Sequence, residues 1–140
     1  MILADSSVLV ALCDRTDPLA PRALEQLRSF NARRLRITLP VLTETWHLLE
    51  GPWLRHILVE WLKGIAAPVV CPVEECGAIA DVWRWLEKYD DHEPDFADAY
   101  LVIASTDKRS SIWTFDTEFA HVWRHLDGSR PRLTFPISRR

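Results

Sequence analysis

The sequence is poor in several residue types, and each shortage excludes a class of protein. Only 4 of its 140 residues are glycine, and no P-loop or dinucleotide-binding glycine motif is present. No apolar run approaches the ~20 residues needed to cross a bilayer. The 3 cysteines lack the C-x-x-C spacing of redox and zinc sites, so no disulfide framework or zinc centre is indicated, and Cys13 is expected to be a buried free thiol.

The sequence also lacks an excess of positive charge. Lys and Arg number 17 against 20 Asp and Glu, and the formal net charge of -3 argues against a protein that coats nucleic acid with a basic surface. Most of the basic residues are arginine, the better group for bidentate phosphate contacts, although GC-rich coding produces the same bias.

The length and the 48% hydrophobic content fit one compact domain over residues 1–140. The first residues, MILADSS, carry an acid where a signal peptide carries basic residues. We therefore expect a cytoplasmic protein.

Short apolar runs alternate with segments of helical periodicity. Strands are expected at Ile2–Ala4, Arg36–Leu39, Val69–Cys71 and Ile112–Phe115, with a further candidate at Leu133–Phe135. Helices are expected between them, among others over residues 41–49, 74–89, 96–108 and 118–126, with Pro40 halting the second strand. Strands separated by helices predict an α/β fold with a mainly parallel sheet of four to five short strands.

Acidic residues gather where the predicted strands end. Asp5 and Asp116 directly follow the first and fourth strands, and Glu44 lies in the first turns of the helix after the second. Asp95 and Asp98 open the helix in PDFADAYLVIA, where their i, i+3 spacing puts them on one face. Ligands of parallel sheets bind beyond the carboxyl ends of the strands, so these acids are expected to converge there.

A cluster of carboxylates requires protons or a cation, because two of them ~4 Å apart repel by roughly 4 kcal/mol at an effective dielectric of 20. Lysine is nearly absent from these segments, so a divalent metal is the expected counter-charge, and oxygen ligands select Mg²⁺ or Mn²⁺. Such a site suits phosphodiester hydrolysis. Taken singly, Asp95 also fits a helix N-cap, Asp116 a cap of the next helix, and Glu44 a solvated helix residue.

Four ordered motifs, MILADSSVLVAL, TETWHLL, DFADAYLVIAS and WTFDTEF, resemble the PIN-domain nucleases. The sequence looks most like the toxin ribonucleases of VapBC toxin–antitoxin modules, and the resemblance covers essentially the whole chain. It implies a PIN-like three-layer α/β/α domain over residues 1–140.

The resemblance also implies a set of site residues. The four acids of the family fall on Asp5, Glu44, Asp98 and Asp116, which would hold Mg²⁺ or Mn²⁺ and carry the catalysis. Auxiliary positions fall on Asp95, Thr114 and Ser6, with Ser7 as the alternative to Ser6.

The implied function is a metal-dependent endoribonuclease, the toxin of a type II toxin–antitoxin module. Its partners would be an RNA substrate, a cognate antitoxin and a second copy of the chain, with no membrane. Candidate contacts to the RNA backbone are Arg15, Arg33, Arg34 and Arg36.

Other functions stay open at this point. An RNA-processing PIN nuclease without an antitoxin would carry the same acids, and a degenerate PIN-like binding module would have lost some of them. A haloacid-dehalogenase-like phosphatase needs D-x-D at the first strand end, where this sequence has Asp5-Ser6-Ser7, and a downstream lysine that we cannot place.

The 7 tryptophans are unusual for this length. Trp46, Trp61 and Trp83 fall on apolar helical faces and are expected in the core. Trp53, Trp85 and Trp123 fit either the core or a protein interface.

Overall fold

The computed structural model describes residues 1–137 and contains a sheet of four short strands. They are β1 (Ile2–Ala4), β2 (Leu35–Thr38), β3 (Val69–Val70) and β4 (Ser111–Trp113), in the order β3-β2-β1-β4. All three pairings are parallel, as the sequence predicts. The carboxyl ends of the strands therefore meet at one edge of the sheet.

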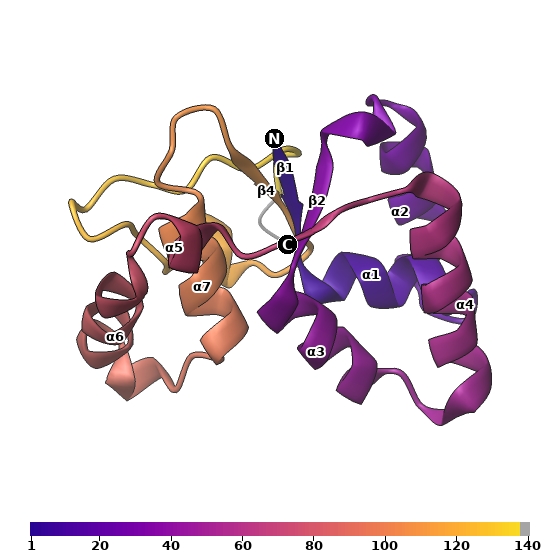
Figure 1. Cartoon of the computed structure of the whole chain (residues 1–140), viewed down its shortest axis with the longest axis horizontal. Coiled ribbons are helices and arrows are strands. Elements are labelled where there is room, and N and C mark those ends of the chain that lie inside the picture. The colour runs from indigo at the N-terminus through magenta and orange to yellow at the C-terminus, as the bar shows by residue number, and fades with distance from the viewer. Residues whose placement is uncertain (138–140) are drawn as a thin grey trace.

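Helices cover both faces of this sheet (Figure 1). On one side lie α1 (Ser6–Cys13), α2 (Ala20–Arg28), α3 (Leu39–Leu48) and α4 (Gly51–Ile65). On the other lie α5 (Pro72–Glu75), α6 (Ile79–Lys88) and α7 (Phe96–Ala104), and α8 (Glu118–His121) follows β4. Two short 3₁₀ turns, η1 (Ala32–Arg34) and η2 (Asp90–His92), complete the regular structure. The three-layer α/β/α arrangement is confirmed.

The hydrophobic core is built around β1 and α7. All three residues of β1 are buried, as are six of the nine residues of α7. This explains why β1 is a continuous apolar run without alternation, the pattern of a strand covered on both faces, and why α7 is apolar apart from Asp98 in its first turn. Below them Trp85, Tyr89 and Trp123 pack together, with ring centroids 4.5 to 5.3 Å apart.

Three predicted helices are shorter than expected. The helix over residues 74–89 is wrong as one unit, because Gly77 takes a left-handed φ of 66° and separates α5 from α6. The helix predicted to reach residue 108 ends at Ala104, where the Ser105 hydroxyl donates to the Val102 carbonyl at 2.9 Å and competes with the helical pattern. The helix predicted to reach residue 126 ends at His121.

The second strand and the last one also differ from the prediction. Strand β2 ends at Thr38, and Pro40 lies in the first turn of α3, where its missing N–H costs no helical hydrogen bond. The strand expected at residues 133–135 is a single bridge between Ile112 and Leu133.

Two of the three tryptophans expected in the core are about half exposed. Trp46 and Trp83 are 41% and 51% accessible, whereas Trp85 and Trp123 are fully buried. Helical periodicity detects an apolar face but does not tell whether another element covers it. Cys13 is buried, as expected.

Within residues 1–137, none of the helices combines the length and the apolar content that a bilayer crossing requires.

The two neighbouring tryptophans of α6 give a test of this core. Trp85 is fully buried and its indole N–H donates to the Arg124 carbonyl at 2.7 Å, so Trp85→Ala is expected to lower the free energy of unfolding by about 3–5 kcal/mol. The matched variant Trp83→Ala removes a half-exposed ring on the same helix and should cost about 1 kcal/mol or less. Urea denaturation measures both, and equal losses would contradict the packing described here.

Candidate functional site

At the carboxyl edge of the sheet the surface is hollowed over a volume of about 450 Å³. Eight acidic residues line this hollow, which we call the acidic hollow, and its lining contains no Lys, Arg or His among the described residues. They are Asp5, Asp17, Glu44, Glu93, Asp95, Asp98, Asp116 and Glu118. All five acids that the sequence predicts to converge therefore line one space.

Asp5 is the most deeply placed of them. It follows β1, is the N-cap of α1, and is only 3% accessible. Its Oδ1 accepts the backbone N–H of Ser6 at 2.7 Å, and its Oδ2 accepts the hydroxyls of Ser7 at 2.7 Å and Thr114 at 2.8 Å. Burial raises the pKa of Asp5; these donors oppose the rise and the charge of Asp116 adds to it.

The two hydroxyls also bind the backbone that follows β4. Thr114 Oγ1 accepts the N–H of Asp116 at 2.9 Å, and Ser7 Oγ accepts the N–H of Phe115 at 3.1 Å. A hydroxyl has one proton to donate, and both are given to Asp5. The end of β4, and with it Asp116, is thus attached to the carboxylate that ends β1.

Of the two serines at the start of α1, Ser7 has the hydroxyl closer to Asp5. Ser6 contributes its backbone N–H, and its own hydroxyl lies 3.5 Å from Asp5 Oδ1, at the limit of a hydrogen bond. Of the two serines that the sequence leaves open, Ser7 makes the short contact.

Glu44 and Asp95 face each other from α3 and from the start of α7. Burial raises the pKa of Glu44, the nearby Ser6 hydroxyl opposes the rise, and the charges of Asp5 and Asp95 add to it. Asp95 occupies the N-cap position of α7, but its side chain makes no capping hydrogen bond. Its carboxylate is therefore directed to the acidic hollow and not used by the helix.

Asp98 has the most perturbed acid–base behaviour for which a value is resolved. Its pKa is raised to about 8, first by burial and then by the negative charges of Asp5, Asp116, Glu44 and Asp95. Without a cation, Asp98 would therefore hold a proton near neutral pH.

Glu118 is a site residue that the sequence analysis missed. One carboxylate oxygen from each of Asp98, Asp116 and Glu118 lies within 4.8 Å of the other two. The Glu118 N–H donates to Asp116 Oδ1 at 2.9 Å, which folds the chain so that both acids face the same space. The signal was the D-x-E spacing in WTFDTEF, which we interpreted only as a strand end and a helix start.

The donor set fits a hard divalent cation. It consists of carboxylate oxygens that converge from α7, from the connection after β4 and from the start of α8. The described residues that line the acidic hollow bring no positive side chain to neutralise them.

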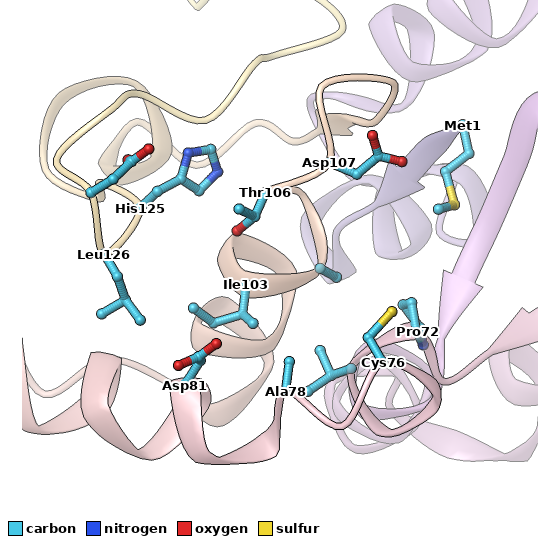
Figure 2. A pocket seen from close by; sticks show the side chains of 13 residues that line it. Met1, Pro72, Cys76, Ala78, Asp81, Ile103, Thr106, Asp107, His125 and Leu126 are labelled. Carbon is cyan, nitrogen blue, oxygen red and sulfur yellow. The ribbon is translucent and has the colours of Figure 1, made fainter.

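A second hollow, of about 400 Å³, lies at the other end of α7 and has a different character (Figure 2). Its floor is apolar, and its acids are separate from one another and locally engaged. Asp81 pairs with Arg84 at 3.1 Å, Asp107 accepts the N–H of Arg109 at 3.0 Å, and Asp127 accepts the N–H of Ser129 at 2.8 Å. Over residues 1–137, no converging set of acidic, His or Cys side chains lies in this space.

Three of the predicted phosphate-binding arginines lie away from the acidic hollow. Arg33 and Arg34 are in η1 and Arg36 is in β2, so all three are near the amino end of that strand. The Arg36 guanidinium donates to the carbonyls of Arg33 and Leu35. The acids are at the opposite, carboxyl end.

Comparison with known proteins places this geometry in a family. The sequence profile of the PIN domain matches residues 2–124. Among solved structures, the chain is similar to the Mycobacterium tuberculosis VapC20 toxin, which cleaves the sarcin–ricin loop, with 24% identity, a TM-score of 0.63, and coverage of 86% of this chain and 93% of that one. It is also similar to FitAcB from Neisseria gonorrhoeae, with 20% identity, a TM-score of 0.55, and coverage of 84% and 88%.

Comparison with curated protein sequences gives no match. The PIN profile nevertheless spans most of the chain, including the four predicted acids Asp5, Glu44, Asp98 and Asp116. Both similar structures share the fold. The chain belongs to the PIN domain family.

Proposed function

We propose that this chain is a metal-dependent endoribonuclease that hydrolyses RNA phosphodiester bonds. The observation that carries the proposal is the convergence of Asp98, Asp116 and Glu118 within 4.8 Å in a hollow whose lining, over the described residues, holds no positive side chain. Membership of the PIN family supports the nuclease assignment. A degenerate binding module is disfavoured because the four predicted acids are all retained and all face the acidic hollow.

The proposed catalytic and metal-binding residues are Asp5, Glu44, Asp98 and Asp116, with Glu118 added to the set. Mg²⁺ or Mn²⁺ is the proposed ion, because both prefer carboxylate oxygens. When bound, such an ion supplies the positive charge that lets water attack a phosphodiester at neutral pH.

The chain's own groups prepare this site. Ser7 and Thr114 are proposed as positioning residues, since their hydroxyls fix Oδ2 of Asp5. Asp98 and Glu44 hold protons more readily than free carboxyls do, and cation binding would release those protons. Asp95 is proposed as auxiliary, acting on the acidic hollow through its charge on Glu44 and Asp98.

We further propose that the nuclease is the toxin of a type II toxin–antitoxin module. The similarity to VapC20, described as a toxin that cleaves the sarcin–ricin loop, and to FitAcB supports this role. A cognate antitoxin and a second copy of the chain are then the proposed protein partners. A small DNA-binding protein encoded beside this gene would favour the toxin over an RNA-processing nuclease without an antitoxin.

The proposed activity predicts metal-dependent cuts in total cellular RNA. The protein should produce discrete fragments with Mg²⁺ or Mn²⁺ and none with EDTA. Asp98→Asn should slow the cleavage by about 10²–10³-fold, because it removes a charged ligand worth several kcal/mol. The control Asp81→Asn changes an exposed acid paired with Arg84 and should cut like the wild type. Cleavage that persists in EDTA and in Asp98→Asn would contradict the proposal.

The crowding of acids predicts that the metal-free site destabilises the fold. In EDTA at neutral pH, Asp98→Asn should raise the melting temperature by about 3–8 °C, because the neighbouring carboxylates and burial force the wild-type acid to take up a proton on folding, a cost that asparagine does not have. Mg²⁺ should raise the melting temperature of the wild type and have less effect on the variant. Calorimetry measures both. A lower melting temperature for metal-free Asp98→Asn, with Asp81→Asn unchanged, would show that repulsion does not dominate.

The same shift predicts how stability depends on pH. The pKa of Asp98 is about 8 in the folded protein and 3.8 as the ordinary value, so between these pH values the folded state binds more protons than the unfolded state. The free energy of unfolding of the metal-free protein should therefore fall as the pH rises from about 4 to about 8, by up to about 1.4 kcal/mol per pH unit from this group. Urea titrations in EDTA should show a shallower fall in Asp98→Asn, and identical slopes would contradict the assignment.

A further inference from the structure

Two side-chain contacts join helix α2 to Trp113, the last residue of β4, and to Phe115, two residues further on. The Trp113 indole N–H donates to Gln26 Oε1 at 2.7 Å, and the Arg22 guanidinium carbon lies 5.5 Å from the centre of the Phe115 ring. Four helical residues span about 6.0 Å and two strand residues about 6.6 Å, so the two contacts match in spacing. The amino end of α2 therefore points in the direction in which β4 ends.

This register brings Arg22 to the edge of the acidic hollow. Phe115 precedes Asp116 directly, and its own N–H donates to Ser7 within the network around Asp5. Leu19, three residues before Arg22 and hence on the same side of the chain as it enters α2, lines the acidic hollow. Arg22 thus packs on the residue that precedes Asp116, and it is not one of the residues that line the acidic hollow.

The guanidinium of Arg22 is available for a ligand. Among residues 1–137 it forms no ion pair and no side-chain hydrogen bond, and the residue is exposed. Its contact with Phe115 is made through the ring face, which limits the orientation of the side chain and leaves the N–H donors open.

Electrostatics indicates what this ligand is. An RNA strand that reaches the acidic hollow meets a lining made of carboxylates, so its phosphates need a cation outside the catalytic ligands. The two N–H groups of an arginine guanidinium match the geometry of a phosphate. Because the Arg22 guanidinium packs on Phe115, the residue before Asp116, its position relative to Asp116 is restricted.

We propose that Arg22 binds a backbone phosphate of the RNA next to the one that is cut, and so sets the register of the strand on the acidic hollow. This inference rests on the proposed nuclease function. It replaces Arg33, Arg34 and Arg36, which lie near the amino end of β2, as phosphate contacts at the acidic hollow.

Binding of a fluorescein-labelled single-stranded RNA of mixed sequence tests the contact. All proteins carry Glu44→Gln, so that the RNA stays intact in Mg²⁺, and anisotropy is recorded between about 50 and 200 mM KCl. Adding Arg22→Gln should weaken binding by about tenfold and reduce the slope of log K against log[salt] by about 0.7, the value for one phosphate contact with a single strand. Adding Arg22→Lys should keep the slope and recover part of the affinity.

Arg28→Gln is the matched control. Arg28 is also an exposed arginine of α2, but it lies six residues, about 9 Å, further from the acidic hollow, and its loss should leave affinity and slope as in the parent. Phe115→Leu keeps the charge of Arg22 and removes the ring beneath it, and should lower affinity without changing the slope.

Turnover of the same RNA by the chain with Glu44 intact gives an independent readout. Arg22→Gln should raise KM by about tenfold and leave kcat within about twofold, because the contact is made before the chemical step. Equal slopes and equal KM for Arg22→Gln and its parent, with RNA bound and cut by both, would overturn the role of Arg22 and leave the nuclease intact. A parent chain that neither binds nor cuts RNA would overturn both proposals.

Discussion

Carboxylates that repel one another are held together at one edge of this sheet because they belong to, or directly follow, buried apolar segments. Asp5 follows three fully buried residues of β1, and Asp98 belongs to a helix in which six of nine residues are buried. Moving either acid away from its neighbours would require moving those segments out of the core, at about 25 cal/mol for each Å² of apolar surface exposed. The hydrophobic core therefore fixes the spacing of charges that would otherwise separate.

The same constraint explains why the pKa values rise together. Burial is the first cause of the raised pKa of Asp5, Glu44 and Asp98, and in each case the charge of at least one neighbouring carboxylate adds to the rise. No described lysine or arginine lines the space to oppose this, and Arg22 stands at its edge, packed on Phe115. The lining of the acidic hollow thus leaves its carboxylates to be neutralised by protons or by the proposed divalent cation.

The sequence was informative where one short segment decides the structure. Apolar runs that end in an acid predicted β1 and β4 and the convergence of Asp5 with Asp116. It failed where a distant contact decides. Gly77 separates two helices that the sequence pattern joins, and Glu118 reaches the other acids through a turn after β4. The contact with Phe115, which leads us to propose Arg22 as a phosphate contact, is likewise set by tertiary packing. Trp83 and Trp85 differ in burial although both lie on one helix, because only tertiary packing determines which side of it is covered.

The direction of the hydrogen bonds around Asp5 has a consequence for any substitution there. Ser7 and Thr114 each accept a backbone N–H and so turn their protons toward Oδ2, while Ser6 offers an N–H to Oδ1. Every partner of this side chain is a donor. In an asparagine at this position, the NH₂ group would face at least one of these donors and could not accept its hydrogen bond. The site therefore favours a side chain whose two oxygens both accept. An ionised aspartate accepts from all of these donors at once, so the same hydrogen bonds that position the side chain also oppose the rise that burial causes in its pKa.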